Sequence, residues 1–351
     1  MPLVRIRDIK TGKTETFFKG DYSQEYVLHN GDYIIGMDGE FNITEWQGGE
    51  ALLNQRVCRV IVSSDKVLPK YILYFLPLPL KRIEEETPFV TVKHLSSKKL
   101  NDVIVPVPTI EEQQRIVDEL DLLNGIIDKK NAQLRDLDAL AQSIFYEMFG
   151  DPITNDRGWP AKAIGEFAEV TDYVANGSFA TLRANVSYKS EPDYAVLVRL
   201  ADFSNGFDKS KFVYVDKHAY DFLAKSKLLG GEIIMSNVGS VGKAFLCPDL
   251  KTPMSLAPNS ILIRTPNNVF SFACFKMPSF QEAIREITSQ TALPKFNKTE
   301  FKKIRIINPD AFSQKQFEEK WQAIKFKETS IIASLNDAKQ LLDSRMAFYF
   351  S

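Results

Sequence analysis

The stretch TIEEQQRIVDELDLLNGIIDKKNAQLRDLDALAQSIFYEMFG, residues 109–150, decides the architecture of this chain. Its apolar residues recur at intervals of three, four or seven, which places them along one stripe of an α-helix. They are Ile116, Leu120, Leu123, Ile127, Leu134, Leu137, Leu140, Ile144 and Met148. Glu111 and Glu112 lie where the helix dipole favours negative charge, and Gly150 followed by Pro152 provides a stop signal. We therefore predict one helix about 60 Å long, at 1.5 Å per residue.

Residues 310–351 repeat this pattern and predict a second long helix. The apolar positions are Phe317, Trp321, Ile324, Ile331, Leu335, Ala338, Leu341 or Leu342, and Phe348.

The two long stretches belong to an internal repeat. A shift of 201 residues places HLSSKKLNDVIVPVP, residues 94–108, on KFNKTEFKKIRIINP, residues 295–309, and continues without a gap into both helices. Upstream, GDYIIGMDG from Gly31 corresponds to GEIIMSNVG from Gly231, and VRIRDIKTG from Val4 corresponds to VRLADFSNG from Val198. The chain therefore consists of two copies of one unit, each a globular part followed by a long helix.

This repeat divides the chain into four blocks. We predict globular parts at residues 1–108 and 151–309, followed by the helices at 109–150 and 310–351. Short apolar runs such as EIIMS and NSILIRT predict strands of an antiparallel or mixed sheet, hence an α+β fold with two mixed α/β globular domains. Residues 151–193 have no counterpart in the first copy, so we expect its globular part to be incomplete at the amino end and to expose apolar surface or a sheet edge.

Composition indicates a soluble globular protein. Of 351 residues 44% are hydrophobic and 25% are charged. No run reaches the roughly 18 apolar residues of a membrane helix, and the amino end lacks the apolar core of a signal peptide, so we expect a cytoplasmic location without membrane contact. Cys58, Cys247 and Cys274 and three histidines lack the spacing of a disulfide framework or a metal site. We therefore expect no metal and no cofactor.

Charge is distributed unevenly along the chain. Residues 151–309 carry 20 basic against 16 acidic residues, residues 109–150 carry 4 against 9, and the other two blocks are balanced. The second globular part thus holds the positive surplus. Such a surplus is most often a solvated face and only weakly indicates nucleic-acid binding.

Signatures of catalysis are missing from the sequence. TGKT at residues 11–14 lacks the glycine that a phosphate-binding loop carries five residues earlier, where Arg7 stands. A nucleotide methyltransferase needs a glycine-rich cofactor turn and an N/D-P-P motif, and the nearest string is NPD at Asn308. No G-x-S-x-G elbow occurs. These observations favour a binding protein without a catalytic site of its own.

The order of motifs resembles the specificity subunit of type I restriction-modification systems. It comprises GDYIIGMDGEFN (31–42), LLNQRVCRV (52–60), LNDVIVPVPTIEEQQRIV (100–117), FGDP (149–152), GW (158–159) and GEIIMSNVGSVGKA (231–244). The resemblance implies that each globular part is a target-recognition domain and that the two helices pack antiparallel as a coiled-coil spacer. It further implies sequence-specific reading of a bipartite site in double-stranded DNA, and a complex with two methylase subunits and with restriction subunits for translocation and cleavage.

Within the two recognition domains, polar residues on glycine-bounded loops are the candidates for DNA contact, because arginine and asparagine read base edges and lysine grips phosphate. In the second copy they are Ser178, Arg183, Asn185, Ser236, Asn237, Ser240, Lys243, Lys295, Asn297 and Lys298. In the first copy they are Arg5, Arg7, Lys10, Lys13, Asn54, Gln55, Arg56 and Lys93. Ordinary turn chemistry is the alternative for these loops. Asp38 and Glu40 repel phosphate, so their loop is expected to position the chain or to contact cytosine amino groups.

Two functions remain open on sequence alone. In the first, the chain reads a bipartite DNA site and directs a separate methylase and nuclease. In the second, it is a truncated or recombined specificity protein that binds the methylase but reads only a half-site, which the unmatched residues 151–193 suggest.

Overall fold

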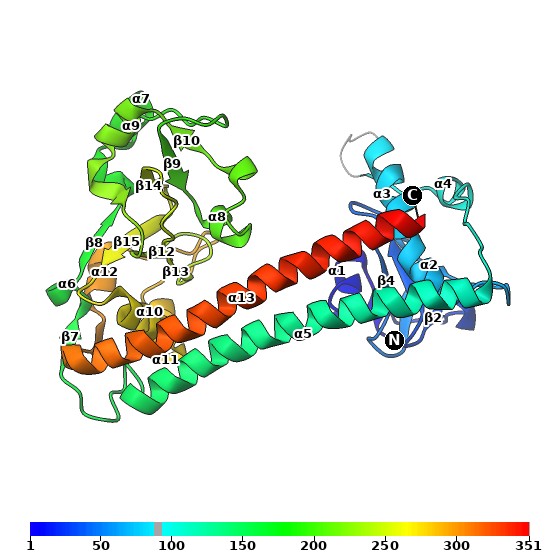
Figure 1. Cartoon of the computed structure of the whole chain (residues 1–351), viewed down its shortest axis with the longest axis horizontal. Coiled ribbons are helices and arrows are strands. Elements are labelled where there is room, and N and C mark those ends of the chain that lie inside the picture. The colour runs from blue at the N-terminus through cyan, green and yellow to red at the C-terminus, as the bar shows by residue number, and fades with distance from the viewer. Residues whose placement is uncertain (88–92, 351) are drawn as a thin grey trace. The chain divides into compact units, whose positions relative to one another are not determined.

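The computed structural model describes residues 1–87 and 93–350, and packing divides the chain into two compact units. Figure 1 labels many of their helices and strands. The first unit comprises residues 1–133 and 331–351, and the second comprises residues 134–330. Each unit therefore contains one half of each long helix. The four-block domain division stays a prediction, because packing groups the helix halves with the globular parts.

The two long helices begin and end where their capping residues stand. Helix α5 runs Ile110–Phe149 and helix α13 runs Ala311–Phe350, both inside the predicted ranges; Ser351 lies outside the described residues. The Thr109 hydroxyl accepts from the Glu112 amide, and the Asp310 carboxylate accepts from the Ser313 amide, so both helix starts are capped by side chains. Gly150 ends α5 with φ of 74°, a conformation that glycine adopts without strain.

In the first unit, the beginning of α5 packs against the end of α13, so the two helices run antiparallel there. Ile116 and Leu120 of α5 share one buried core with Phe350 of α13. Beside that core, Arg345 Nη2 of α13 donates to Glu119 Oε2 of α5 over 2.9 Å. An apolar seam flanked by an ion pair is the packing that the apolar stripes predict.

In the second unit, the end of α5 packs against the beginning of α13, again antiparallel. Phe145 and Phe149 of α5 lie in one core with Phe317 and Trp321 of α13. The Phe145 and Phe317 rings meet edge to face, with 5.4 Å between their centroids. Aromatic side chains thus fill the seam at this end.

Acid should weaken the packing at the first unit's end of the helix pair. The Arg345 hydrogen bond, together with that of Tyr349, holds the pKa of Glu119 below its ordinary value of 4.5. When folding lowers the pKa of a carboxyl, the ionised carboxylate stabilises the folded state. This stabilisation is complete above the pKa of the carboxyl in the unfolded chain, and it is lost as the pH falls through the pKa in the folded chain. We therefore expect the thermal unfolding temperature to fall below pH 4.5 less steeply in Glu119→Gln than in the parent chain. Asp343→Asn, at an exposed position on the same segment of α13, is the control and should keep the parent's acid dependence; equal slopes in all three chains would contradict the assignment.

The first unit contains two three-stranded sheets. One has the order β1-β5-β2, with β1 and β5 parallel, and the other has the order β4-β3-β6 and is antiparallel. Helices α2 and α3 and the helix seam cover the core that contains Ile35. The strands are β1 (Leu3–Val4), β2 (Val27–Leu28), β3 (Tyr33–Gly36), β4 (Ile43–Glu45), β5 (Ala51–Leu53) and β6 (Val57–Val60). The short helices are α1 (Ile6–Ile9), α2 (Pro69–Phe75), α3 (Pro77–Glu86) and α4 (Ser97–Asn101).

The second unit repeats both sheets and adds one strand to each. Their orders are β10-β9-β14-β11 and β13-β12-β15-β8, and a separate pair joins β16 to β7. The strands are β7 (Ala161–Ala163), β8 (Glu169–Asp172), β9 (Ala195–Val198), β10 (Tyr214–Val215), β11 (Lys227–Leu228), β12 (Ile233–Ser236), β13 (Ala244–Leu246), β14 (Met254–Leu256), β15 (Ser260–Arg264) and β16 (Arg305–Ile307). The short helices are α6 (Ile164–Phe167), α7 (Phe179–Asn185), α8 (Leu200–Ser204), α9 (Lys217–Phe222), α10 (Asn268–Lys276), α11 (Pro278–Glu286) and α12 (Lys298–Lys303).

The two units have the same topology wherever the sequence repeats. The parallel pair β1–β5 corresponds to β9–β14, and the antiparallel pair β3–β6 corresponds to β12–β15. The Arg5 amide donates to the Asp8 carboxylate at the start of α1, and the Arg199 amide donates to Asp202 at the start of α8. The predicted mixed α+β architecture is therefore confirmed. Among the described residues, no helix combines the length and the apolar character needed to span a membrane.

Candidate nucleic-acid interface

Each unit presents a loop on the same backbone frame at the end of its central antiparallel strand. The first strand-end loop, residues 37–42, follows β3, and the second strand-end loop, residues 237–243, follows β12. The Met37 amide donates to the Arg56 carbonyl over 2.9 Å, and the Asn237 amide donates to the Asn259 carbonyl over 3.2 Å. The first loop is thus tied to the turn between β5 and β6, and the second loop to the equivalent turn between β14 and β15.

Further main-chain hydrogen bonds repeat between the two loops. Gly39 donates to the Lys93 carbonyl, and Gly239 donates to the Pro294 carbonyl, each over 2.9 Å. The β-bridge between Asp38 and His94 recurs as a bridge between Val238 and Lys295. The glycines have φ of 76° and 78°, which explains why both loops need glycine at this point. The frame is shared, whereas the side chains on it differ.

The second strand-end loop places exposed polar and basic side chains on this frame. Ser240, Lys243 and, from the adjoining segment, Lys295 are exposed. In residues 1–87 and 93–350, the hydrogen bonds that tie these lysines to the frame use backbone atoms: the Lys243 carbonyl accepts from the Ser236 amide, and the Lys295 amide donates to the Ser289 hydroxyl. These ammonium and hydroxyl groups can therefore reach a phosphate or a base edge.

A small hollow adjoins the second strand-end loop. It has a volume of about 190 Å³, and its lining includes Asn237, Asn259 and Phe179. The Phe179 side chain is 76% exposed at the start of α7. An exposed aromatic ring beside amide side chains is a surface on which a base can stack while its edge is hydrogen-bonded.

Several predicted residues around this loop are engaged in holding the fold. Ser236 is buried, and its hydroxyl donates to the Val238 carbonyl over 3.1 Å. Asn297 caps α12 by accepting from the Glu300 amide. Lys298 pairs with the Asp172 carboxylate over 2.8 Å. These three side chains brace the loop, so their direct role in DNA contact stays a prediction.

The predicted residues of α7 lie along a helix that begins beside the hollow. Ser178 caps α7 by accepting from the Thr181 amide. Arg183 is exposed on the same helix, and Asn185 at its end lies 3.1 Å from the His218 ring of α9. Only the start of α7 lines the hollow, which separates Arg183 and Asn185 from the second strand-end loop's pocket.

The first strand-end loop places an acidic cluster on the same frame. Asp38 contacts the His94 ring, and Arg56 Nη1 lies 3.5 Å from Asp38 Oδ1. Lys93 turns inward, where its Nζ donates to the Glu84 carbonyl over 2.7 Å. Of the predicted residues, Arg56 thus remains exposed at the loop, whereas the Lys93 side chain is held by a hydrogen bond within the fold.

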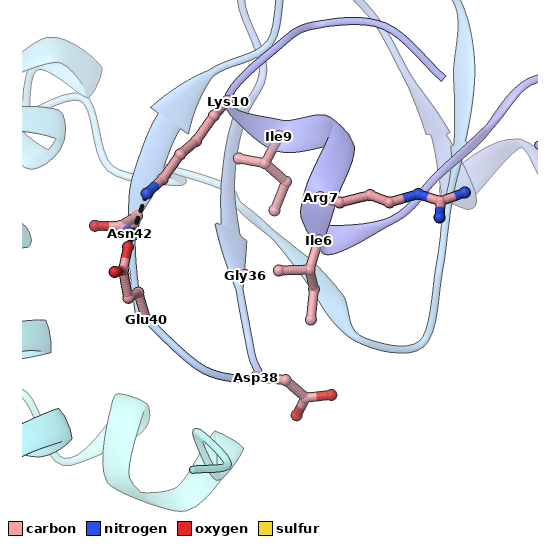
Figure 2. Close-up of a pocket in the computed structure, with 8 residues that line it drawn as sticks. All are labelled: Ile6, Arg7, Ile9, Lys10, Gly36, Asp38, Glu40 and Asn42. Atoms are coloured by element: carbon pink, nitrogen blue, oxygen red, sulfur yellow. Dashed lines mark hydrogen bonds and ion pairs between the residues drawn. The ribbon is translucent and has the colours of Figure 1, made fainter. Parts of the chain in front are cut away.

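A hollow of about 250 Å³ lies between α1 and the first strand-end loop, and Figure 2 draws the residues that line it. Lys10 crosses it to Glu40, with 2.7 Å between Nζ and Oε2, whereas Arg7 extends away from Glu40. The hydrogen bond from Lys10, with a second from Asn42, lowers the pKa of Glu40. The carboxylate is therefore charged at neutral pH and holds the Lys10 ammonium in an ion pair across the hollow.

The remaining predicted residues of the first copy do not join the strand-end loop. Arg5 and Lys13 are exposed at either side of α1. Asn54 and Gln55 lie in the turn before β6, where the Asn54 side chain accepts from the Arg56 amide over 3.1 Å. Arg5, Lys13 and Gln55 are exposed, and their contacts with DNA stay predictions.

Sequence reasoning missed three residues that the structure places at the loops. Asn259 occupies the position of Arg56 in the repeated frame and has φ of 71°. Asparagine in the turn APNS before a strand is a recognisable signal for that conformation. Phe179 and His94 carried no comparable signal, because an exposed ring and a loop histidine cannot be told from core residues in one sequence.

No group of three or more histidine, cysteine or acidic side chains suited to a metal occurs in residues 1–87 and 93–350. The Cys274 thiol is buried, and burial raises the pKa of Cys247 to about 12. What the two loops offer is recognition chemistry: hydrogen-bond donors and acceptors, positive charge and one exposed ring.

Comparison with known proteins gives the family. A family model for the type I restriction modification DNA specificity domain matches residues 1–136. The type I restriction enzyme EcoBI specificity subunit of Escherichia coli is 30% identical over 262 residues, which is 69% of this chain and 55% of that protein. The MjaVIII specificity subunit of Methanocaldococcus jannaschii is 20% identical over 67% of this chain and 56% of that protein. The chain thus spans about half the length of the curated relatives it matches.

A solved structure supports the same fold. It comes from work on complex assembly and conformational transition of the type I R-M system, and it matches with a TM-score of 0.51 at 14% identity over 99% of this chain and 90% of that chain. The family model, the curated relatives and the duplicated fold agree. The chain belongs to the family of type I restriction-modification specificity subunits.

Proposed function

We propose that this chain reads the sequence of double-stranded DNA at two places, one with each strand-end loop, and directs separate methylase and restriction subunits to that site. The observation that carries the proposal is the repeated backbone frame with exchanged side chains. Where the first loop has Asp38, His94 and Arg56, the second has Val238, Lys295 and Asn259. One scaffold with two sets of exposed side chains suits two readers of different sequences.

The chemistry of the two loops predicts different contacts. The second loop combines Lys243 and Lys295 for phosphate with Asn259, whose amide can pair with the edge of adenine. The first loop combines Arg56, which can pair with guanine, with Asp38, which can accept from a cytosine amino group. Asp38 also lies within reach of Arg56, so the acidic side chain orients the arginine in the unbound chain.

The long helices would set the separation of the two readers. Each helix is continuous over 40 residues, and each contributes its two halves to different units. A continuous helix is a stiff spacer, and it would keep the two half-sites at a fixed number of base pairs. Methylase and restriction subunits are the proposed partners that act on the DNA so bound, because the relatives are specificity subunits of such enzymes.

Methylation mapping tests the proposal. The chain is expressed with its methylase partner in a host that lacks other methylation, and modified bases are located genome-wide. We expect one motif split into two halves by a fixed gap. Arg56→Ala should relax one position in one half, and Asn259→Gly should relax one position in the other half. Each should lose about tenfold or more in discrimination, the value of one good base contact.

The paired variants serve as each other's control, because they occupy the same place in the two frames. Asn259→Gly removes the side chain while keeping the positive φ that glycine tolerates. A motif with only one half, unchanged by Arg56→Ala, would favour the half-site alternative. Methylation of the same motif without this chain would refute the proposal altogether.

A further inference from the structure

One exposed aromatic ring adjoins the second strand-end loop. Phe179 is 76% exposed, whereas every other phenylalanine of residues 151–309, all of which the structure describes, is buried or half-buried. Scattered apolar side chains are ordinary on a protein surface. Phe179, however, lines the hollow of about 190 Å³ that Asn237 and Asn259 also line. The exposed ring is therefore part of the candidate DNA interface.

The backbone holds Phe179 in a fixed place at the start of α7. The Ser178 hydroxyl accepts from the Thr181 amide over 3.2 Å, and the Leu182 amide donates to the Ser178 carbonyl over 2.8 Å. Leu182 is buried in one core with Tyr173. The exposed ring thus stands on a turn that is already anchored in the unbound chain. Such preorganisation lowers the entropy that a contact costs when it forms.

The surroundings of the ring suit contact with the apolar faces of bases. Val174 and Pro258 line the same hollow and are also exposed, so apolar surface continues around the ring. Asp172 is the charged residue of the lining, and Lys298 pairs with its carboxylate over 2.8 Å. This ion pair offsets the negative charge that would otherwise oppose DNA at the hollow.

The basic residues of the second strand-end loop lie next to this hollow. Val238, which lines the hollow, forms a β-bridge with the exposed Lys295. Asn259 is exposed in the lining, and its backbone carbonyl accepts from the Asn237 amide. A DNA strand whose phosphate is bound by Lys295 would therefore bring a neighbouring base to the amides and to the ring.

We propose that Phe179 enters a base step of the bound DNA, next to the base pair that Asn259 contacts, and that recognition by the second unit depends on how readily this step unstacks. This inference rests on the proposed function. Proteins insert phenylalanine or leucine between base pairs in this way, and the cost of unstacking is recovered through the contacts that the bent DNA permits. Pyrimidine–purine steps are the most easily unstacked. We therefore expect TA or CA/TG at this step.

Sequence selection tests the inference. The full chain with its methylase partner is incubated with duplexes that contain a randomised stretch, and the bound duplexes are sequenced. The parent should favour a pyrimidine–purine step by roughly tenfold, beside the position that Asn259→Gly relaxes. Phe179→Ala should reduce this preference to within about twofold and leave the other positions of the motif unchanged, because it removes the inserted ring but no contact with a base edge.

Two further variants distinguish insertion from general apolar contact. Phe179→Leu should keep the step preference, because leucine also inserts between base pairs. Leu293 is 60% exposed and stands two residues before Lys295, but it lies outside the described lining of the hollow. Leu293→Ala should therefore leave the step preference unchanged. Both positions are exposed, so the fold is retained in all of these variants.

Fluorescence of 2-aminopurine reports the unstacking directly. The analogue replaces the adenine of the selected step, which TA and CA/TG both contain. Its emission rises when stacking is lost. We expect this rise when the duplex binds the parent chain or Phe179→Leu, and no rise with Phe179→Ala.

Several outcomes would overturn the inference and leave the proposed function standing. These are a selected motif with the same step preference in the parent and in Phe179→Ala, or a motif without a pyrimidine–purine step beside the position that depends on Asn259. Unchanged emission on binding to the parent, or loss of the step preference in Leu293→Ala, would also overturn it. Recovery of no enriched sequence with the parent chain would instead refute the proposed function, and this inference with it.

Discussion

Replacing Phe145 with alanine should destabilise the second unit by about 3–5 kcal/mol, the range measured for truncating a large buried aromatic side chain. Phe145 is fully buried in the seam between α5 and α13. Its ring packs against Phe149, Phe270 and Phe317, with centroid separations of 5.2, 5.6 and 5.4 Å. Truncation leaves a cavity that three rigid rings cannot fill. For a unit of this size we expect the unfolding temperature to fall by on the order of 10 °C.

Phe326→Ala is the matched control for this substitution. Phe326 is the same residue type in the same unit, on α13, but its side chain is 80% exposed. Its truncation should change the free energy of unfolding by about 0.5 kcal/mol or less. Differential scanning calorimetry gives the unfolding temperatures, and hydrogen exchange in β12 and β15 reports on the second unit separately. Equal effects of the two substitutions would show that the seam does not stabilise this unit.

The long helices and the repeat could be predicted because both depend on patterns that extend over many residues. The spacing of residues such as Ile116 and Leu120 continues for about ten helical turns, so single exceptions do not obscure it. The end of the first long helix could also be predicted, because Gly150 follows it. This glycine has the positive φ that favours glycine at a helix end. The shift of 201 residues equated segments that the structure then forms as equivalent helices, α4 with α12 and α5 with α13.

The pairing of strands could not be predicted to the same degree. Strands such as β1 and β2 contain two residues each, too few to show an alternation of apolar and polar side chains. Arg59 illustrates a second limit. It occupies the position of the fully buried Leu262, yet its guanidinium donates from Nη1 to the Val27 carbonyl over 2.8 Å and from Nη2 to the Glu25 carbonyl over 2.9 Å. These two carbonyls hold a charged group in a half-buried strand, although the buried Nε has no partner among the described residues.

The candidate site was only partly predictable, because a loop residue's role depends on what its side chain meets. Ser236 ends strand β12 and Lys243 ends the polar loop that follows it, yet the first is buried and the second is exposed. Lys298 looks like Lys295 in sequence, but it lies beside Asp172, 126 positions earlier in the numbering, and forms an ion pair with it. Such long-range partners leave no trace in local sequence.

Removing the two exposed lysine charges at the second strand-end loop should cause a large loss of DNA affinity. Lys243 and Lys295 are both exposed on the repeated frame. Each phosphate contact releases about 0.9 counterion, so losing one contact near 0.1 M salt lowers affinity by about tenfold. Lys243→Gln combined with Lys295→Gln should therefore weaken binding by about two orders of magnitude, and the plot of log affinity against log salt should flatten by roughly two units.

Random-sequence duplexes are the appropriate probe, because phosphate contacts do not depend on base sequence. Fluorescence anisotropy between 50 and 200 mM salt, about the range over which such contacts are resolved, gives both the affinity and the salt slope. Lys320→Gln, an exposed lysine on α13 in the same unit, is the control and should leave the slope unchanged. Should the double variant keep the parent's slope while Lys320→Gln flattens it, the DNA would lie against the long helix and not against the second strand-end loop. If only the intercept changed and not the slope, the two lysines would act through the shape of the loop, because a lost phosphate contact must alter the number of ions released.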